Sequence, residues 1–264
     1  MPQFVREFGV SHYETQGTGP PLLLLNGLGF SRWSWSWQWD RLPDLRLILL
    51  ENRGLGGSDL GQHPFDMGDL ADDAARLLDH LGVDKACVWG VSMGGMIAQE
   101  FALRHPSRCA GLILGCTMCG GSDTVYMSAE VLETMSRLAR DGYQPDSVQE
   151  ALGLNFSPKV PPSVTDVYVA LRSANSPPLE TWNWQRDASL RFDTGSRLSN
   201  YTGPTLLLHG GADAVVPSAN LAVLAQKLTQ AELYQWPQAR HLFWIEEAAE
   251  VNTLVEDFVQ QCWR

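Results

Sequence analysis

The chain has 264 residues, enough for one large α/β domain or two ordinary ones, and 44% of them are hydrophobic. Its net charge of −11 repels phosphate backbones and anionic lipid, so neither nucleic acid nor a membrane surface is an expected partner. Five cysteines, an odd number, argue against a disulfide scaffold. Cys116 and Cys119 lack the second pair that a zinc site would need, so no metal is expected.

The N-terminus also argues against export. Its residues, MPQFVREFGVSHYE, carry charges where a signal peptide needs an apolar core. No apolar run approaches the ~18–20 residues that a membrane-spanning helix requires. We therefore predict a soluble, cytoplasmic protein.

Short apolar runs alternate with helical patterns through the first half of the chain. Continuous apolar runs are typical of strands buried on both faces of a sheet. Helical spacing of apolar residues appears between the runs, at 66–82 and 94–106. The predicted strands span residues 3–8, 10–15, 21–27, 45–52, 86–91 and 109–116. This alternation predicts a mostly parallel sheet flanked by helices.

The strand pattern stops between residues 117 and 200, where helical stretches and prolines replace it. It returns with PTLLLHGG at 204–211 and AELYQWP at 231–237, and an amphipathic helix closes the chain. We predict an α/β core formed by residues 1–116 and 201–264. Residues 117–200 are predicted to form a helical cap, or lid, inserted after the sixth strand.

The stretch VWGVSMGGM at 88–96 crowds glycines around Ser92. A phosphate-binding loop is excluded, because Met96 and Ile97 occupy the positions of its lysine and its hydroxyl residue. A dinucleotide-binding fingerprint starting at Gly27 is excluded as well, because Arg32 replaces its third glycine.

The pattern G-x-S-x-G does fit, at Gly90, Ser92 and Gly94, between an apolar strand and a helix. In this motif the chain turns sharply from strand to helix, so the serine has a strained backbone and an exposed hydroxyl. Side chains two residues before and after the serine would collide with one another or with the neighbouring strand, so both positions need very small residues. Gly95 lets the helix begin close to the sheet. We predict that Ser92 is a catalytic nucleophile.

A serine hydroxyl reacts only when a base takes its proton and a carboxylate orients that base. In a parallel sheet these groups belong on loops at the carboxyl ends of later strands. The loop after 204–211 offers Asp213, and the loop after 231–237 offers His241. The remaining histidines occupy hairpin, loop or element-end positions that do not suit this role: His12, His63, His80, His105 and His209. The predicted triad is Ser92, His241 and Asp213.

An oxyanion hole needs two N–H donors. The turn itself supplies the backbone N–H of Met93, and the loop after 21–27 offers the backbone N–H of Leu28. This chemistry requires no cofactor and no metal.

These segments resemble the α/β-hydrolase superfamily over nearly the whole chain. The matching motifs are NGLG at 26–29, ENRGLGGSD at 51–59, GVSMGGMIAQEFALRHP at 90–106, HGGADAVVP at 209–217 and RHLFWIEEAAEVNTLVEDF at 240–258. The resemblance is strongest to its capped serine esterases and enol-lactonase-like lactonases, and it implies a mostly parallel eight-stranded sheet. The serine at position 92 excludes the dehalogenase and epoxide-hydrolase branches, whose nucleophile is an aspartate.

Two positions depart from that superfamily. Asn26 stands where most relatives have histidine, and Arg240 stands where relatives commonly have glycine before the catalytic histidine. The role of Arg240 beside His241 stays open.

Four tryptophans alternate in SRWSWSWQWD at 31–40. In the superfamily this stretch resembles the first helix after the oxyanion loop, where Trp33/Trp37 and Trp35/Trp39 become pairs four residues apart. We expect one pair to pack on the sheet and the other on the insertion. The alternatives are that Trp33 walls an apolar acyl pocket and binds substrate, or that the aromatic rings bind carbohydrate.

The expected activity is hydrolysis of a carboxylic ester, or lactone, of a small and largely apolar substrate through an acyl-enzyme. The same triad would serve a C–C bond hydrolase, a thioesterase, an acyltransferase or a perhydrolase. A small-molecule receptor on the same fold is the alternative outside enzymes. The insertion offers arginines for a substrate carboxylate, and it offers these apolar wall residues: Tyr126, Met127, Met135, Phe156, Tyr168, Trp182 and Trp184. The expected partner is a small-molecule substrate, and a homodimer is left open.

Overall fold

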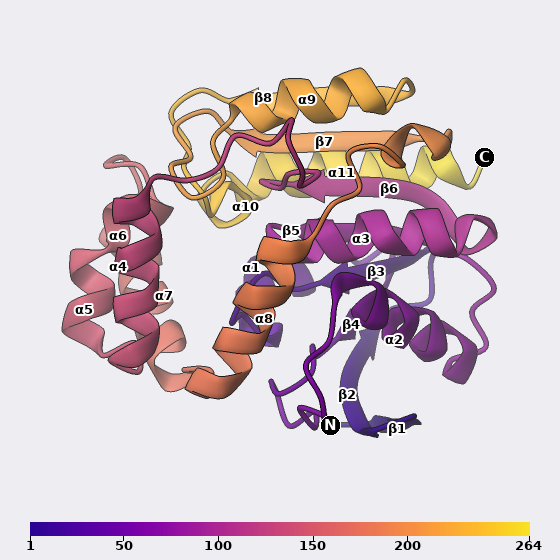
Figure 1. Cartoon of the computed structure of the whole chain (residues 1–264). Coiled ribbons are helices and arrows are strands. Elements are labelled where there is room, and N and C mark those ends of the chain that lie inside the picture. Colours follow the sequence, from indigo (N-terminus) through magenta and orange to yellow (C-terminus); the bar gives the residue numbers. More distant parts are fainter.

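Eight strands form one sheet in the computed structural model, which describes residues 1–264 (Figure 1). Their order is β1-β2-β4-β3-β5-β6-β7-β8; β2 pairs antiparallel with β1 and β4, and all other neighbours are parallel. The strands are β1 (Gln3–Arg6), β2 (Gly9–Gln16), β3 (Pro21–Leu25), β4 (Arg46–Leu50), β5 (Ala86–Val91), β6 (Cys109–Gly115), β7 (Thr205–Gly210) and β8 (Ala231–Trp236). The predicted eight-stranded, mostly parallel α/β fold is confirmed.

Both faces of the central strands are buried, which explains their uninterrupted apolar runs. Along β3, Leu23 and Leu25 join one core cluster while Leu22 and Leu24 join the other, because successive side chains point to opposite faces. One face is covered by α2 (Met67–His80), α3 (Met93–Arg104) and α9 (Ala219–Lys227). The other is covered by η1 (Arg32–Trp35), α1 (Ser36–Trp39), α10 (Phe243–Glu246) and α11 (Ala248–Cys262).

The helices between β6 and β7 are called the cap helices. They are α4 (Ala129–Arg140), α5 (Pro145–Glu150), α6 (Leu152–Asn155), α7 (Pro162–Ala174) and α8 (Leu179–Arg191), and a short η3 (Leu198–Asn200) follows them. The only β pairing in this segment is a single bridge between Gly120 and Asp193. Figure 1 shows α4 to α7 grouped beside the sheet, with α8 leading back along it toward β7. Measured against the length and apolarity that a bilayer crossing requires, every helix of the chain falls short.

Trp35 and Trp33 pack as expected, one on the sheet and the other on the cap. Both lie on a 3₁₀ turn, η1, which precedes α1. Trp35 packs on the sheet beside Trp89, with ring centroids 4.8 Å apart, and Trp33 packs on Tyr168 of the cap at 5.9 Å. Their supposed partners, Trp37 and Trp39, are only half-buried.

Candidate active site

Ser92 lies on a sharp bend between β5 and α3. Its φ of 55° and ψ of −121° lie outside the regions that a non-glycine residue normally occupies, so the backbone is strained there. A Cβ at Gly90 would collide with the backbone of Gly94, and one at Gly94 would collide with the carbonyl of Leu25 in β3. The glycines around Ser92 are thus required by close approach of backbone, as the sequence spacing indicates.

Hydrogen bonds to β6 and the residues after it hold this bend. The Ser92 N–H donates to the Gly115 carbonyl (2.8 Å), and the Thr117 hydroxyl donates to the Ser92 carbonyl (2.8 Å). A Cβ at Gly95 would lie 2.6 Å from the Thr117 Cβ, which leaves no room for a side chain at the first turn of α3. The strained conformation is therefore fixed by neighbouring elements rather than by the bend alone.

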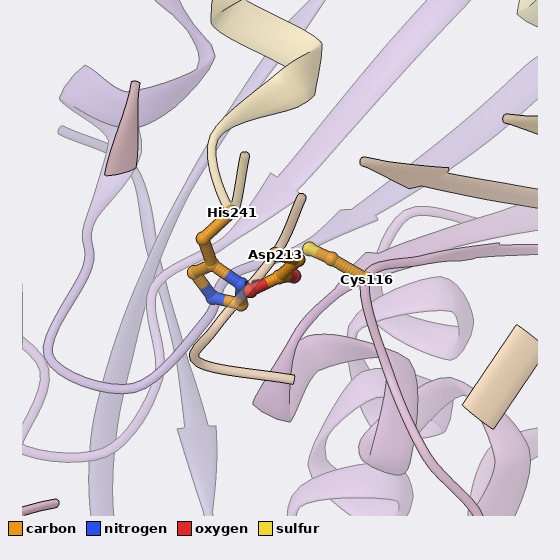
Figure 2. Close-up of side chains that lie close together, drawn as sticks. All are labelled: Cys116, Asp213 and His241. Atoms are coloured by element: carbon orange, nitrogen blue, oxygen red, sulfur yellow. Dashed lines mark hydrogen bonds and ion pairs between the residues drawn. The ribbon is translucent and has the colours of Figure 1, made fainter. Parts of the chain in front are cut away.

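Asp213 and His241 meet at the carboxyl ends of β7 and β8. Asp213 Oδ2 lies 2.8 Å from His241 Nδ1, and both side chains are buried (Figure 2). The other carboxylate oxygen, Oδ1, accepts the N–H groups of Val215 (2.8 Å) and Val216 (2.9 Å). These bonds fix the carboxylate and, through it, the orientation of the imidazole, so that Nε2 is left for another partner.

Ser92 and His241 line the same cavity beneath the cap helices. The structure has no direct hydrogen bond between the Ser92 hydroxyl and His241 Nε2; such bonds are often long in unliganded enzymes and tighten when substrate binds. None of the other five histidines lines a cavity that Ser92 reaches. The structure thus brings the three predicted triad residues into one neighbourhood.

Cys116 is a neighbour of this pair that the sequence did not point to. It follows β6 with a φ of 39°, and its sulfur, a carboxylate oxygen of Asp213 and a ring nitrogen of His241 lie within 4.8 Å of one another (Figure 2). Burial, helped by the Asp213 charge, raises the pKa of this thiol well above its ordinary value. A metal ion held by all three would have to replace the hydrogen bond between Asp213 and His241, and it would need a thiolate that this environment disfavours.

The two predicted oxyanion donors flank Ser92. The Leu28 N–H makes no hydrogen bond, and the Met93 N–H is the first of α3, where the helical ladder supplies no acceptor. The loop that carries Leu28 is held from the cap on both sides of Gly29. Gln185 Oε1 accepts the Gly29 N–H (2.8 Å), and Arg172 Nη1 donates to the Gly29 carbonyl.

The two residues that depart from the superfamily connect the site loops to their surroundings. Asn26 donates to the Leu50 carbonyl (3.0 Å) and accepts from Trp35 Nε1 (2.9 Å), so it ties the start of the oxyanion loop to β4 and η1. Arg240 donates to the Gly153 carbonyl of α6. This bond joins the His241 loop to the cap.

The predicted role of Trp33 as a substrate-binding wall is not supported. Trp33 lines neither cavity at Ser92, because Phe30 and Tyr168 lie in front of it: Phe30 stacks on its ring (centroids 5.2 Å apart) and lines the cavity instead. Of the suggested apolar wall residues, Phe156 and Trp184 also stay outside both cavities. The others do line them: Tyr126, Met127, Met135, Tyr168 and Trp182.

Comparison with known proteins identifies the family. The family model for the alpha/beta hydrolase fold matches residues 20–248, so the chain belongs to the α/β-hydrolase fold family. It is 32% identical to the poly(3-hydroxyalkanoate) depolymerase of Ectopseudomonas oleovorans, over 91% of this chain and 84% of that protein. It is 27% identical to the 2-hydroxymuconate semialdehyde hydrolase of Pseudomonas sp. (strain CF600), over 93% of this chain and 88% of that protein.

Solved structures agree with this assignment. A thermophilic esterase from Thermogutta terrifontis superposes with a TM-score of 0.81 at 28% identity, covering 96% of this chain and 94% of that one. The family and these relatives indicate that the chain is a hydrolase.

Proposed function

We propose that the protein is a serine hydrolase that cleaves a carboxylic ester, or lactone, of a small and largely apolar substrate. The observation that carries this proposal is the 2.8 Å contact between Asp213 and His241, on an imidazole that lines the same cavity as Ser92. The strained bend at Ser92 supports it, since strain of this kind concentrates at functional residues.

In the proposed reaction His241 Nε2 takes the proton of the Ser92 hydroxyl as the oxygen attacks the ester carbonyl. The oxyanion that forms accepts hydrogen bonds from the N–H groups of Leu28 and Met93, while Asp213 stabilises the imidazolium. His241 then gives its proton to the leaving alcohol, and the acyl group stays on Ser92. A water molecule, activated by the same imidazole, releases the acid and restores the serine.

An ester is favoured because the relative with the highest quoted identity, a depolymerase of poly(3-hydroxyalkanoate), and the quoted solved structure, an esterase, both point to ester hydrolysis. The relative named as a semialdehyde hydrolase keeps C–C bond hydrolysis as the second candidate. Thioester hydrolysis, acyl transfer, perhydrolysis and ligand reception would use the same residues, and the test below distinguishes turnover from binding.

The test is hydrolysis of p-nitrophenyl butyrate by the wild-type chain and by Ser92→Ala, together with labelling by a fluorophosphonate. Loss of the nucleophile should lower the rate by about 10⁴-fold or more and abolish labelling. Full esterase activity in a clean Ser92→Ala preparation would falsify the assignment. Labelling of Ser92 without steady-state turnover of esters or of C–C substrates would favour a receptor.

A further inference from the structure

Two cavities meet at Ser92. The first, which we call the His241 cavity, has a volume of only about 50 Å³, whereas the second has a volume of about 250 Å³. They share four lining residues, Leu28, Ser92, Met135 and Val215. A substrate whose reacting carbonyl lies at Ser92 can therefore extend a short arm into one cavity and a long arm into the other.

The larger cavity, which we call the methionine cavity, fits an apolar chain. Five methionines line it: Met93, Met96, Met118, Met127 and Met135. Methionine side chains are apolar and flexible, so they adapt to chains of different shape. Tyr126 and Leu190 line it too and are about half exposed, so the cavity reaches the surface between the loop before α4 and the end of α8. Its single charged residue, Arg186, is already paired with Asp187 at 2.7 Å.

The His241 cavity contains a buried positive charge without an acidic partner. Arg172 of α7 is 1% exposed, no carboxylate lies within ion-pair distance of it, and no acidic residue lines the cavity. Its Nη1 donates to the Gly29 carbonyl, and its guanidinium stacks on Tyr143 with Cζ 3.6 Å from the ring centroid. Phe30 and Trp33 also face the guanidinium, with Cζ 4.7 and 5.9 Å from their ring centroids. Nε and Nη2 have no hydrogen-bond acceptor in the protein, so both can donate to a ligand in the cavity.

The position of His241 decides which arm of the substrate enters which cavity. His241 lines the smaller cavity and not the methionine cavity. In ester hydrolysis the imidazole gives its proton to the leaving alcohol, so the alcohol part must lie on the His241 side. The acyl chain is then left for the methionine cavity.

We infer that the substrate is an ester between an apolar acyl chain and a short hydroxy acid, whose free carboxylate binds Arg172. This inference rests on the proposed function and specifies its substrate class. A guanidinium with two unoccupied donor groups suits a carboxylate, since such pairs form short, charge-assisted hydrogen bonds. The small size of the His241 cavity limits the hydroxy acid to a few carbon atoms.

The test compares 3-(octanoyloxy)propanoate with 3-(octanoyloxy)propanamide, which has nearly the same shape but no charge, by measuring octanoate release. The wild-type chain should prefer the carboxylate by about tenfold or more in kcat/KM. In Arg172→Met this ratio should fall to about one. The ratio is the readout, because loss of the bond to Gly29 slows both substrates alike.

Gln185→Leu is the matched control, since Gln185 holds the same Gly29 but lines neither cavity. It should slow both substrates equally and keep the wild-type ratio. Calorimetry of 3-hydroxypropanoate against 3-hydroxypropanamide gives a second readout without turnover, and only the acid should bind with a dependence on Arg172.

The possible failures are separable. If Ser92→Ala abolishes hydrolysis but the wild-type chain does not distinguish the two esters, the assignment of Arg172 is wrong and the proposed function stands. If Gln185→Leu removes the preference as Arg172→Met does, the effect belongs to the loop and the assignment is also wrong. If Ser92→Ala retains activity, the proposed function itself fails.

Discussion

Two buried arginines in this protein have opposite surroundings. Arg53, after β4, makes two hydrogen bonds to Asp73 of α2, at 2.6 and 3.0 Å. Arg172 in the cap is buried more deeply, at 1% exposed against 8% for Arg53, and has no acidic neighbour. The charge that lies outside the cavities at Ser92 is paired with a carboxylate, and the charge that lines one of them is not. On the proposal above, the first arginine supports the fold and the second binds substrate.

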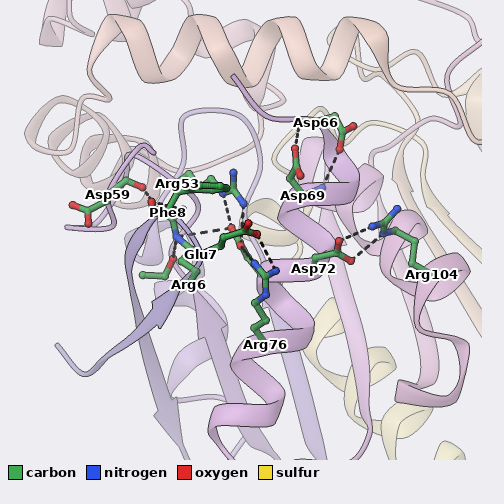
Figure 3. A network of polar contacts seen from close by, with 12 residues as sticks. Arg6, Glu7, Phe8, Arg53, Asp59, Asp66, Asp69, Asp72, Arg76 and Arg104 are labelled. Carbon is green, nitrogen blue, oxygen red and sulfur yellow. Dashed lines mark hydrogen bonds and ion pairs between the residues drawn. The ribbon is translucent and has the colours of Figure 1, made fainter. Parts of the chain in front are cut away.

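Figure 3 shows the arginines around the first arrangement: Arg6 from β1, Arg53 from the segment after β4 and Arg76 from α2. Asp73 of α2 lies within 4.0 Å of all three. Arg6 also donates to the Ser11 hydroxyl at 2.6 Å. The network joins β1, the segment after β4 and α2, so its removal should affect stability rather than chemistry.

The largest effect is expected on activity, from a change at Asp213, the acid that contacts His241. Asp213→Asn keeps the size of the side chain but favours the wrong imidazole tautomer and no longer stabilises the imidazolium. We expect kcat for p-nitrophenyl butyrate to fall by about 10⁴-fold while the fold persists. Steady-state kinetics and circular dichroism check this, and a fall of less than tenfold would mean that another residue orients His241.

The next effect tests the structural arginine. Asp73→Asn leaves Arg53 and Arg6 without their carboxylate in a buried setting, so the free energy of unfolding should fall by about 3–5 kcal/mol. Urea denaturation measures it. Asp79→Asn on the same helix is the control: its pair with Arg108 is largely exposed, and such pairs contribute about 0–1 kcal/mol. Equal losses in both variants would remove the distinction between the two regions.

The positions of Ser92, Asp213 and His241 were predictable because local sterics and topology specify them. Gly90 and Gly94 are needed wherever a strand turns directly into a helix around an exposed serine. Parallel strands end at one edge, so residues following β7 and β8, here Asp213 and His241, must lie near that serine. The mostly parallel sheet followed from the alternation of apolar runs with helical patterns, and the resemblance to the α/β-hydrolases implied its eight strands.

The cavity residues were not predictable from the sequence. Arg172 was one of several arginines in the insertion, and only the packing of the cap helices distinguishes it, because helical periodicity does not fix where a helix docks. The position of Phe30 was not predictable either: it lines the cavity and stacks on Trp33, which lies outside. Cys116 was considered only with Cys119 as a zinc pair, and that spacing did not point to its place beside Asp213 and His241.

Glu51 extends the comparison to a buried acid. One of its carboxylate oxygens accepts the Arg32 N–H, and the other has no hydrogen-bond partner. Burial raises its pKa from 4.5 to about 7, although the Arg32 N–H and charge oppose the shift. Because the pKa of Glu51 is higher in the folded than in the unfolded chain, its contribution to the free energy of unfolding is fully present below about pH 4.5. That contribution is lost as the pH rises through 7. A shift of this size corresponds to about 3 kcal/mol.

Glu51→Gln should remove that dependence. The difference in unfolding free energy between the wild-type chain and Glu51→Gln, measured by urea denaturation from pH 4 to 8, should move in favour of the variant as pH rises. A difference that stays constant over this range contradicts the prediction.

The smallest effect is expected on the stability of the chain when Arg172, the arginine without an acidic partner, is replaced. Arg172→Met replaces a buried cation by an apolar side chain of similar length; it loses the bond to Gly29 and the stacking on Tyr143, but it also removes an uncompensated charge. Because buried ions replaced by apolar residues often leave stability unchanged, we expect unfolding free energy to change by about 1 kcal/mol or less. Urea denaturation beside Asp73→Asn checks it. A loss as large as that of Asp73→Asn would mean that Arg172 supports the fold after all, and the two regions would then differ only in which groups surround the charge.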